Sequence, residues 1–300
     1  MSGRVDLGYA EVPVFFDTQE ARLFGIVTLP ARSHPHTGLV ILPGAGTPFT
    51  VNRNRLSVRL GRELAQLGYA VLRCDYHGVG DSTGTIDRFH LAHPFTEDVV
   101  AAVSRLRQLG VSRVILVGSC FGGRSALSAA ALLEDVEAVV LLATSVRDYE
   151  RGERKTVDAA NTWSVGRFLR EALRPRRLRG MFDPRARRRY QKYARAKLRA
   201  MGSPSESAQG ATVSPVYERP FRSLVERGVP ILQVFGDDDS SYVDYLTAAN
   251  GLLADALEAA GDRVQVLTIP GKIHGFLTPP IQDAVVQTVV AWAAKRRAIR

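Results

Sequence analysis

The sequence predicts a single α/β domain with a mainly parallel sheet of about eight strands and an inserted helical cap. Residues 114–133 read as a buried β-branched strand, a sharp turn and a helix rich in small residues. Short apolar runs alternate with amphipathic stretches along most of the chain. With 300 residues and a 45% apolar content, the chain can bury one large core.

Before residue 114, turn signals separate apolar strands from helical patterns. The two N-terminal strands are joined by a short turn that contains Thr18, Gln19 and Glu20, so we expect them to pair antiparallel. Gly68 and Gly110 follow the two helical patterns and predict where these helices stop. The predicted strands are 12–17, 23–29, 38–42 and 70–75, and the predicted helices are 53–67 and 95–109.

After residue 133 the alternation resumes, with one long interruption. The predicted strands are 136–143, 230–235 and 264–269, and the predicted helices are 248–260 and 281–294. The stretch 144–228 is too long for a simple crossover between strands. Its recurring apolar and aromatic residues predict a mostly helical cap over about 158–201, with a flexible return over 202–214. We therefore divide the chain into a core, 1–145 and 225–300, and a cap insertion, 146–224.

The net charge of +10 is unevenly distributed. Between residues 151 and 200, 17 basic and 4 acidic residues give a charge of +13, so the rest of the chain carries −3. The basicity therefore belongs to the predicted cap. No nucleic-acid-binding motif accompanies these arginines, and we expect no nucleic-acid partner.

Composition also argues against several other classes of protein. Two cysteines, Cys74 and Cys120, provide neither a disulfide framework nor a metal-ligand cluster, so we expect no metal and no cofactor. The N-terminal residues lack the basic start and apolar stretch of a signal peptide. No run of 18 apolar residues occurs, so we expect no membrane span and a cytoplasmic location.

The turn after the strand at 114–117 has the pattern G-x-C-x-G, from Gly118 to Gly122. A nucleophile at such a tip has strained backbone geometry, and the residues two before and two after it crowd each other, which favours glycine at both. Cys120 would stand at a helix N-terminus, where the peptide dipoles favour the reactive thiolate. The amide of Phe121 would point to where an oxyanion forms.

These residues resemble the nucleophile elbow of the α/β-hydrolase fold, in members with a cysteine such as dienelactone hydrolases and hydrolase-like proteins of biosynthetic pathways. The resemblance extends over roughly residues 10–145 and 225–300. Residues 73–84 resemble the family's R-x-D-x-x-G-x-G-x-S-x-G signature, which implies a rigid loop near the site. We interpret His77 as part of that loop, with a place in the wall of the pocket as the alternative.

The resemblance implies a triad in the chain order Cys120, Asp239, His274. Asp239 is the fourth residue of a G-x-x-D pattern after the strand 230–235, but Asp237 and Asp238 adjoin it and stay open as the acid. Asp148, past the strand 136–143, is a reserve candidate. The turn after the strand 38–42 implies a second oxyanion donor, the amide of Ala45.

Such a site implies acyl transfer through an acyl-Cys intermediate, with hydrolysis of an ester or thioester as the primary hypothesis. Acyl transfer or cyclising release in a biosynthetic pathway, and a non-catalytic ligand-binding role, are alternatives. The basic cap suggests docking of coenzyme A or an acyl carrier protein, since arginine pairs with phosphate and carboxylate. The candidate docking residues are Arg174, Arg176, Arg177, Arg187, Arg188 and Arg189.

Overall fold

Eight strands form one sheet in a computed structural model that describes residues 8–31, 34–45, 50–86, 89–149 and 213–298. The order is β1-β2-β4-β3-β5-β6-β7-β8, with β1, β2 and β4 pairing antiparallel and β4 onward pairing parallel. The bounds are β1 Tyr9–Asp17, β2 Arg22–Pro30, β3 Thr37–Leu42, β4 Ala70–Cys74, β5 Arg113–Ser119, β6 Val136–Leu142, β7 Ile231–Gly236 and β8 Val264–Ile269. This architecture confirms the predicted fold class.

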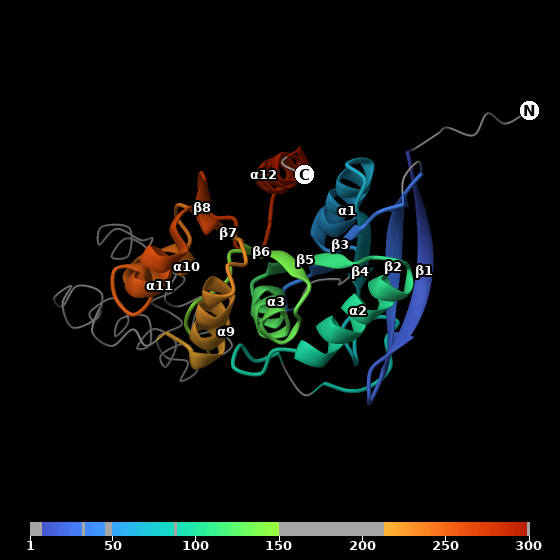
Figure 1. Ribbon diagram of the computed structural model, residues 1–300, viewed down its shortest axis with the longest axis horizontal. Helices are drawn as coiled ribbons and strands as arrows, with labels where there is room; N and C mark the ends of the chain where they lie inside the picture. Colours follow the sequence, from blue (N-terminus) through green and yellow to red (C-terminus); the bar gives the residue numbers. More distant parts are fainter. Residues whose placement is uncertain (1–7, 32–33, 46–49, 87–88, 150–212, 299–300) are drawn as a thin grey trace, which may run out of the picture.

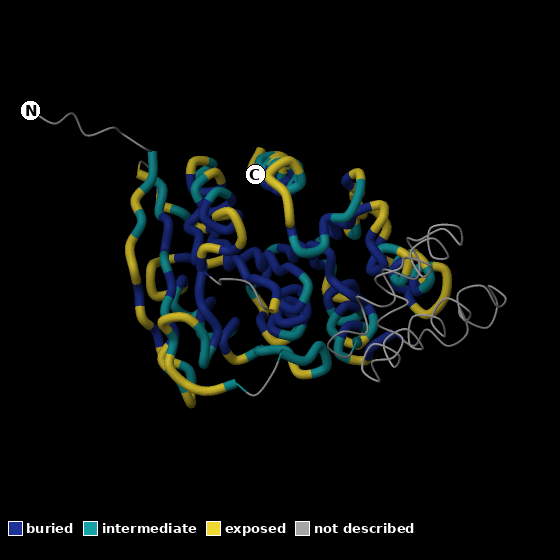
Figure 2. The backbone as a smooth tube through the Cα atoms, turned by 180° about the vertical axis from the view of Figure 1, so that it is seen from behind, coloured by how far each residue is buried: buried dark blue, intermediate teal, exposed yellow. Residues whose placement is uncertain are grey.

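Helices cover both faces of the sheet (Figure 1). On one face lie α1 (Leu56–Gln66) and α12 (Pro279–Ala298); on the other lie α2 (Thr96–Gln108), α3 (Phe121–Leu132) and α9 (Pro215–Glu226). Successive residues of β5 enter the two cores in turn, with Leu116 in one and Val117 in the other. The central strands are therefore buried on both sides, as Figure 2 shows, which explains their continuous apolar sequence.

The single helix predicted over 248–260 is wrong. The structure has α10 (Ser240–Ala249) and α11 (Ala254–Ala260), separated by a turn in which the amides of Gly251 and Leu253 both donate to the carbonyl of Ala248. Glycine ends α10 because it costs the helix more conformational entropy than any other residue. The pattern also missed that α10 begins directly after Asp239, which therefore occupies its N-cap position.

Most of the predicted cap, including its core at 158–201, lies outside the described residues. Within the span assigned to the insertion, the structure describes 146–149 and 213–224. Helix α9, which begins at Pro215, packs on α3 through three completely buried side chains, Tyr217, Phe221 and Leu224. Helix α9 runs across the predicted boundary at 224 and ends at Glu226, and the division into core and cap stays a prediction. None of the helices in the described ranges is long and apolar enough to cross a membrane.

Candidate active site

Cys120 occupies the tip of the turn between β5 and α3, with φ 50° and ψ −109°. A Cβ on Gly118 would lie 2.3 Å from the carbonyl oxygen of Gly122, and a Cβ on Gly122 would lie 2.3 Å from that of Leu42. No side chain fits at either position, so the G-x-C-x-G spacing is a steric requirement of this turn. A cysteine held at a positive φ here is the kind of backbone strain found at functional sites.

The elbow is fixed to the middle of the sheet. The amide of Cys120 donates to the carbonyl of Leu142 on β6, at 2.9 Å. Its side chain is partly exposed, whereas Cys74 on β4 is buried, and burial raises the pKa of the Cys74 thiol far above its ordinary value. Since the thiolate is the nucleophilic form of cysteine, the structure favours Cys120 over Cys74 as a reactive group.

Two backbone segments flank Cys120 where an oxyanion would form. Phe121 is the first residue of α3, and the first amides of a helix have no carbonyl partner within the helix. The loop after β3 lies against the elbow. A Cβ placed on Gly44 would be only 3.3 Å from the Cβ of Cys120. The hydroxyl of Tyr76 donates to the carbonyl of Pro43 at 3.1 Å and holds this loop. Ala45, the second expected donor, follows in the same loop and is exposed.

Asp239 is buried, with 2% of its surface exposed, and it lies between the end of β7 and the start of α10. Its carboxylate accepts hydrogen bonds from the amides of Gly236 at 3.1 Å, Ile273 at 3.2 Å and His274 at 3.2 Å. The carboxylate therefore ties the loop that carries His274 to the end of β7. His274 itself is half-buried in the loop after β8.

The neighbouring carboxylates have different surroundings. Asp237 and Asp238 are both exposed, and Asp237 accepts a hydrogen bond from the amide of Gly271 at 2.6 Å. A buried carboxylate is retained where hydrogen bonds satisfy it, as those to Asp239 do. Of the three adjacent candidates, Asp239 therefore has the environment expected of an acid that supports His274.

Asp148, the reserve acid, pairs with Arg124 on the nucleophile helix. The Nη2 of Arg124 lies 3.2 Å from an Asp148 oxygen, and its Nε donates to the carbonyl of Ser145 at 2.7 Å. Arg124 is completely buried, and this burial lowers the pKa of the guanidinium to about 10. Arg124 was not predicted from the sequence as a residue of the site; an arginine within the small-residue run of an elbow helix is the signal that points to it.

The loop after β4 is rigidly held. The Asp75 carboxylate accepts hydrogen bonds from the amides of Thr50 at 2.8 Å and Asp81 at 3.3 Å, and burial raises the pKa of this carboxyl group. The imidazole of His77 lies 2.9 Å from the buried carboxylate of Asp98, which also accepts the His77 amide at 2.8 Å. These bonds fasten the loop to α2, in keeping with the structural role predicted for it.

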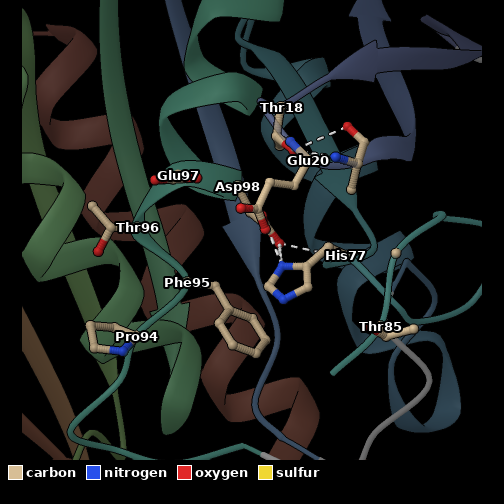
Figure 3. Close-up of a pocket in the computed structure, with 11 residues that line it drawn as sticks. Thr18, Glu20, His77, Thr85, Pro94, Phe95, Thr96, Glu97 and Asp98 are labelled. Carbon is tan, nitrogen blue, oxygen red and sulfur yellow. Dashed lines mark hydrogen bonds and ion pairs between the residues drawn. The ribbon is translucent and has the colours of Figure 1, made fainter. Parts of the chain in front are cut away.

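A cavity of about 420 Å³ opens beside this loop, between the β1–β2 turn and the start of α2 (Figure 3). His77 and Asp98 contribute to its wall, and the Phe95 ring lies 4.4 Å from the imidazole. Phe95 in turn contacts Phe121, with ring centroids 4.9 Å apart. Aromatic packing thus stands between this cavity and the elbow, and none of Cys120, Asp239 and His274 is among the residues that line it.

The candidate docking arginines, from Arg174 to Arg189, lie outside the described residues. Within the ranges that are described, no group of three or more His, Cys, Asp or Glu side chains is arranged to hold a metal ion. The described part of the candidate site therefore consists of the elbow, the loop after β3 and the loops after β7 and β8.

Residues 39–250 match the family model described as the alpha/beta hydrolase fold. No curated protein matches the sequence. Among solved structures, the chain is similar to an esterase from Pyrococcus furiosus, with 14% identity, a TM-score of 0.59 and coverage of 97% of this chain and 94% of that one. It is also similar to dienelactone hydrolase from Anabaena variabilis (19% identity, TM-score 0.56, coverage 95% and 97%). A third similar structure is Est1E from Butyrivibrio proteoclasticus with ferulic acid bound, with 18% identity, a TM-score of 0.58 and coverage of 95% of this chain and 99% of that one. At these identities the likeness shows the fold.

Proposed function

The chain belongs to the α/β-hydrolase fold family and is an enzyme of that superfamily, and we propose that it hydrolyses an ester or thioester through Cys120, Asp239 and His274. The observation that carries the proposal is Cys120, a partly exposed cysteine at the strained tip of the β5–α3 turn. Structural neighbours described as esterases and as a dienelactone hydrolase support the same reaction class.

In the proposed reaction, His274 takes the proton of the Cys120 thiol, and the resulting thiolate attacks the carbonyl carbon of the substrate. The amides of Phe121 and Ala45 stabilise the negative charge on the carbonyl oxygen. The bond to the leaving oxygen or sulfur then breaks, and His274 donates the proton that the leaving group takes. Water, deprotonated by His274, attacks the acyl-Cys and releases the acid and the thiol. Asp239 orients the imidazole and stabilises its protonated form.

Intact-protein mass spectrometry tests this proposal. After mixing with a series of aryl esters and acyl thioesters, the protein should gain the mass of one acyl group, and that gain should be absent from Cys120→Ala. Both substrate classes are needed, because a cysteine nucleophile can form its acyl intermediate from an ester or from a thioester. Turnover without an adduct that depends on Cys120 would refute the mechanism.

Acyl transfer from a carrier-bound substrate is the second candidate function, and the charge distribution favours it. A segment with a net charge of +13 interrupts a chain that is otherwise slightly acidic. Coenzyme A presents phosphates, and acyl carrier proteins present acidic helices. Arginine binds both groups through charge-assisted, often bidentate hydrogen bonds. An acyl-Cys can also be passed to an acceptor other than water.

Charge reversal of Arg187, Arg188 and Arg189 should raise KM for a carrier-bound substrate and leave kcat nearly unchanged, because steering charges act mainly on association. A short uncharged ester should be unaffected. The effect should weaken in high salt, which screens exposed charges. Reversal of Arg113, exposed at the start of β5, is the matched control. Equal losses on both substrates would mean that the arginines have a structural role instead.

A further inference from the structure

Tyr76, the second residue after β4, is a completely buried tyrosine that packs among phenylalanines. Its ring meets those of Phe89, Phe95 and Phe121 edge to face, with centroids 5.3 to 6.2 Å apart. A phenylalanine in its place would make the same ring contacts, so packing alone does not require the hydroxyl group. A buried hydroxyl costs free energy unless it is hydrogen-bonded. The partner of this hydroxyl therefore indicates what the tyrosine does.

The hydroxyl of Tyr76 donates to the carbonyl of Pro43 at 3.1 Å, in the loop after β3. Burial raises the pKa of Tyr76 well above its ordinary value, so the hydroxyl stays protonated and remains a donor. The preceding residue, Asp75, holds the same loop further on, where its carboxylate accepts the amide of Thr50 at 2.8 Å. Two consecutive residues after β4 therefore fasten the loop after β3 at two places.

The groups that Tyr76 contacts adjoin both expected oxyanion donors, the amides of Ala45 and Phe121. A peptide group is planar, so a fixed Pro43 carbonyl fixes the orientation of the whole Pro43–Gly44 peptide. Only the φ and ψ angles of Gly44 separate that peptide from the amide of Ala45. On the other side, the Tyr76 ring packs directly on the ring of Phe121. One buried side chain thus contacts both halves of the expected oxyanion site.

We propose that Tyr76 is a positioning residue for the oxyanion site, where its hydroxyl holds the loop after β3 so that the amide of Ala45 faces the oxygen that becomes negative. This role rests on the proposed attack by Cys120 on a carbonyl group. Oxyanion donors are effective because they are fixed before the charge develops. A misplacement of about 1 Å can cost on the order of 10²-fold in rate. Since the hydroxyl is completely buried, it acts through the loop and not by contact with the substrate.

Tyr76→Phe, which removes the hydroxyl and keeps the ring, tests this role in the full-length protein. The maximal rate at which an aryl ester acylates Cys120, measured by time-resolved mass spectrometry, should fall on the order of 10-fold, because one donor is less well placed but not removed. The ester concentration that gives half of this rate should change little. Alkylation of Cys120 by iodoacetamide should keep its wild-type rate, because the thiolate displaces iodide from a saturated carbon and no oxyanion forms. The two rates together separate the oxyanion site from damage to the nucleophile.

Tyr69→Phe is the matched control. Tyr69 is also buried, and its hydroxyl also donates to a backbone carbonyl, that of Ala293 on α12, at 3.0 Å. Tyr69 belongs to the core on the opposite face of the sheet from Tyr76, so this variant should lose comparable thermal stability but no acylation rate.

Three outcomes would refute the role of Tyr76 alone: an unchanged acylation rate in Tyr76→Phe, an equal loss of acylation in both variants, or a parallel loss of alkylation in Tyr76→Phe. Failure of the proposed function is read from the wild type instead. If the wild type formed no acyl adduct on Cys120, the proposed nucleophile and the role of Tyr76 would both be refuted.

Discussion

Replacement of Cys120 by alanine should lower the rate of ester or thioester hydrolysis by on the order of 10³-fold or more. The variant loses the atom that forms the covalent intermediate, and a neighbouring base alone does not replace it, because the members of a triad act as a unit. The fold should survive, since Cys120 is partly exposed and an alanine side chain fits within the space of a cysteine. The measurement is kcat/KM on the substrate that acylates the wild-type protein.

Alkylation distinguishes the nucleophile from the second thiol in the same molecule. Iodoacetamide should label Cys120 stoichiometrically and leave Cys74 unlabelled, because Cys74 is 1% exposed and burial raises the pKa of its thiol. Labelling of Cys74 in a variant would report unfolding, so each sample contains its own test of structure. Cys74→Ala is the matched control and should retain activity. An active Cys120→Ala protein, or equal labelling of both thiols in the folded wild type, would exclude the proposed nucleophile.

Much of the fold could be predicted because the strands are local patterns. The β5 strand is a continuous apolar run because both of its faces are buried, and its turn needs Gly118 and Gly122 for steric reasons. Apolar runs and glycine spacings are visible in a single sequence. The order of the strands is a property of the whole chain, and it was accessible only through the resemblance to a known fold.

Other features depend on contacts between distant segments. Within the run Asp237, Asp238 and Asp239, only the resemblance to a G-x-x-D pattern favoured Asp239. In the structure, burial and the amide of His274, 35 residues away, distinguish it. Arg124 is similar, because an arginine is expected in solvent until the carbonyl of Ser145 and the carboxylate of Asp148 are brought to it from beyond β6. The division between α10 and α11 was missed because one apolar pattern continues across the turn.

Asp239→Asn should lower kcat by on the order of 10³–10⁴-fold. An amide cannot stabilise the imidazolium as a carboxylate does, and it favours the wrong tautomer of the base. The structure predicts a second effect on stability. The Asp239 carboxylate accepts three backbone amides, so the NH₂ group of an asparagine must face a donor or turn away from the His274 loop. We therefore expect both a lower Tm and a lower kcat.

Two further variants separate the catalytic loss from the structural one. Asp238→Asn is the matched control, since Asp238 is exposed, and it should change kcat little. Asp148→Asn should keep a near-normal kcat. It should lower the free energy of unfolding by on the order of 1 kcal/mol, because it leaves the buried Arg124 without its counter-charge. The loss is small because Asp148 itself is partly solvated. Measuring kcat well below each Tm, with Cys120 alkylation as the test of an intact elbow, isolates the role of the acid. If Asp148→Asn abolished turnover and Asp239→Asn did not, the acid that orients His274 would lie after β6.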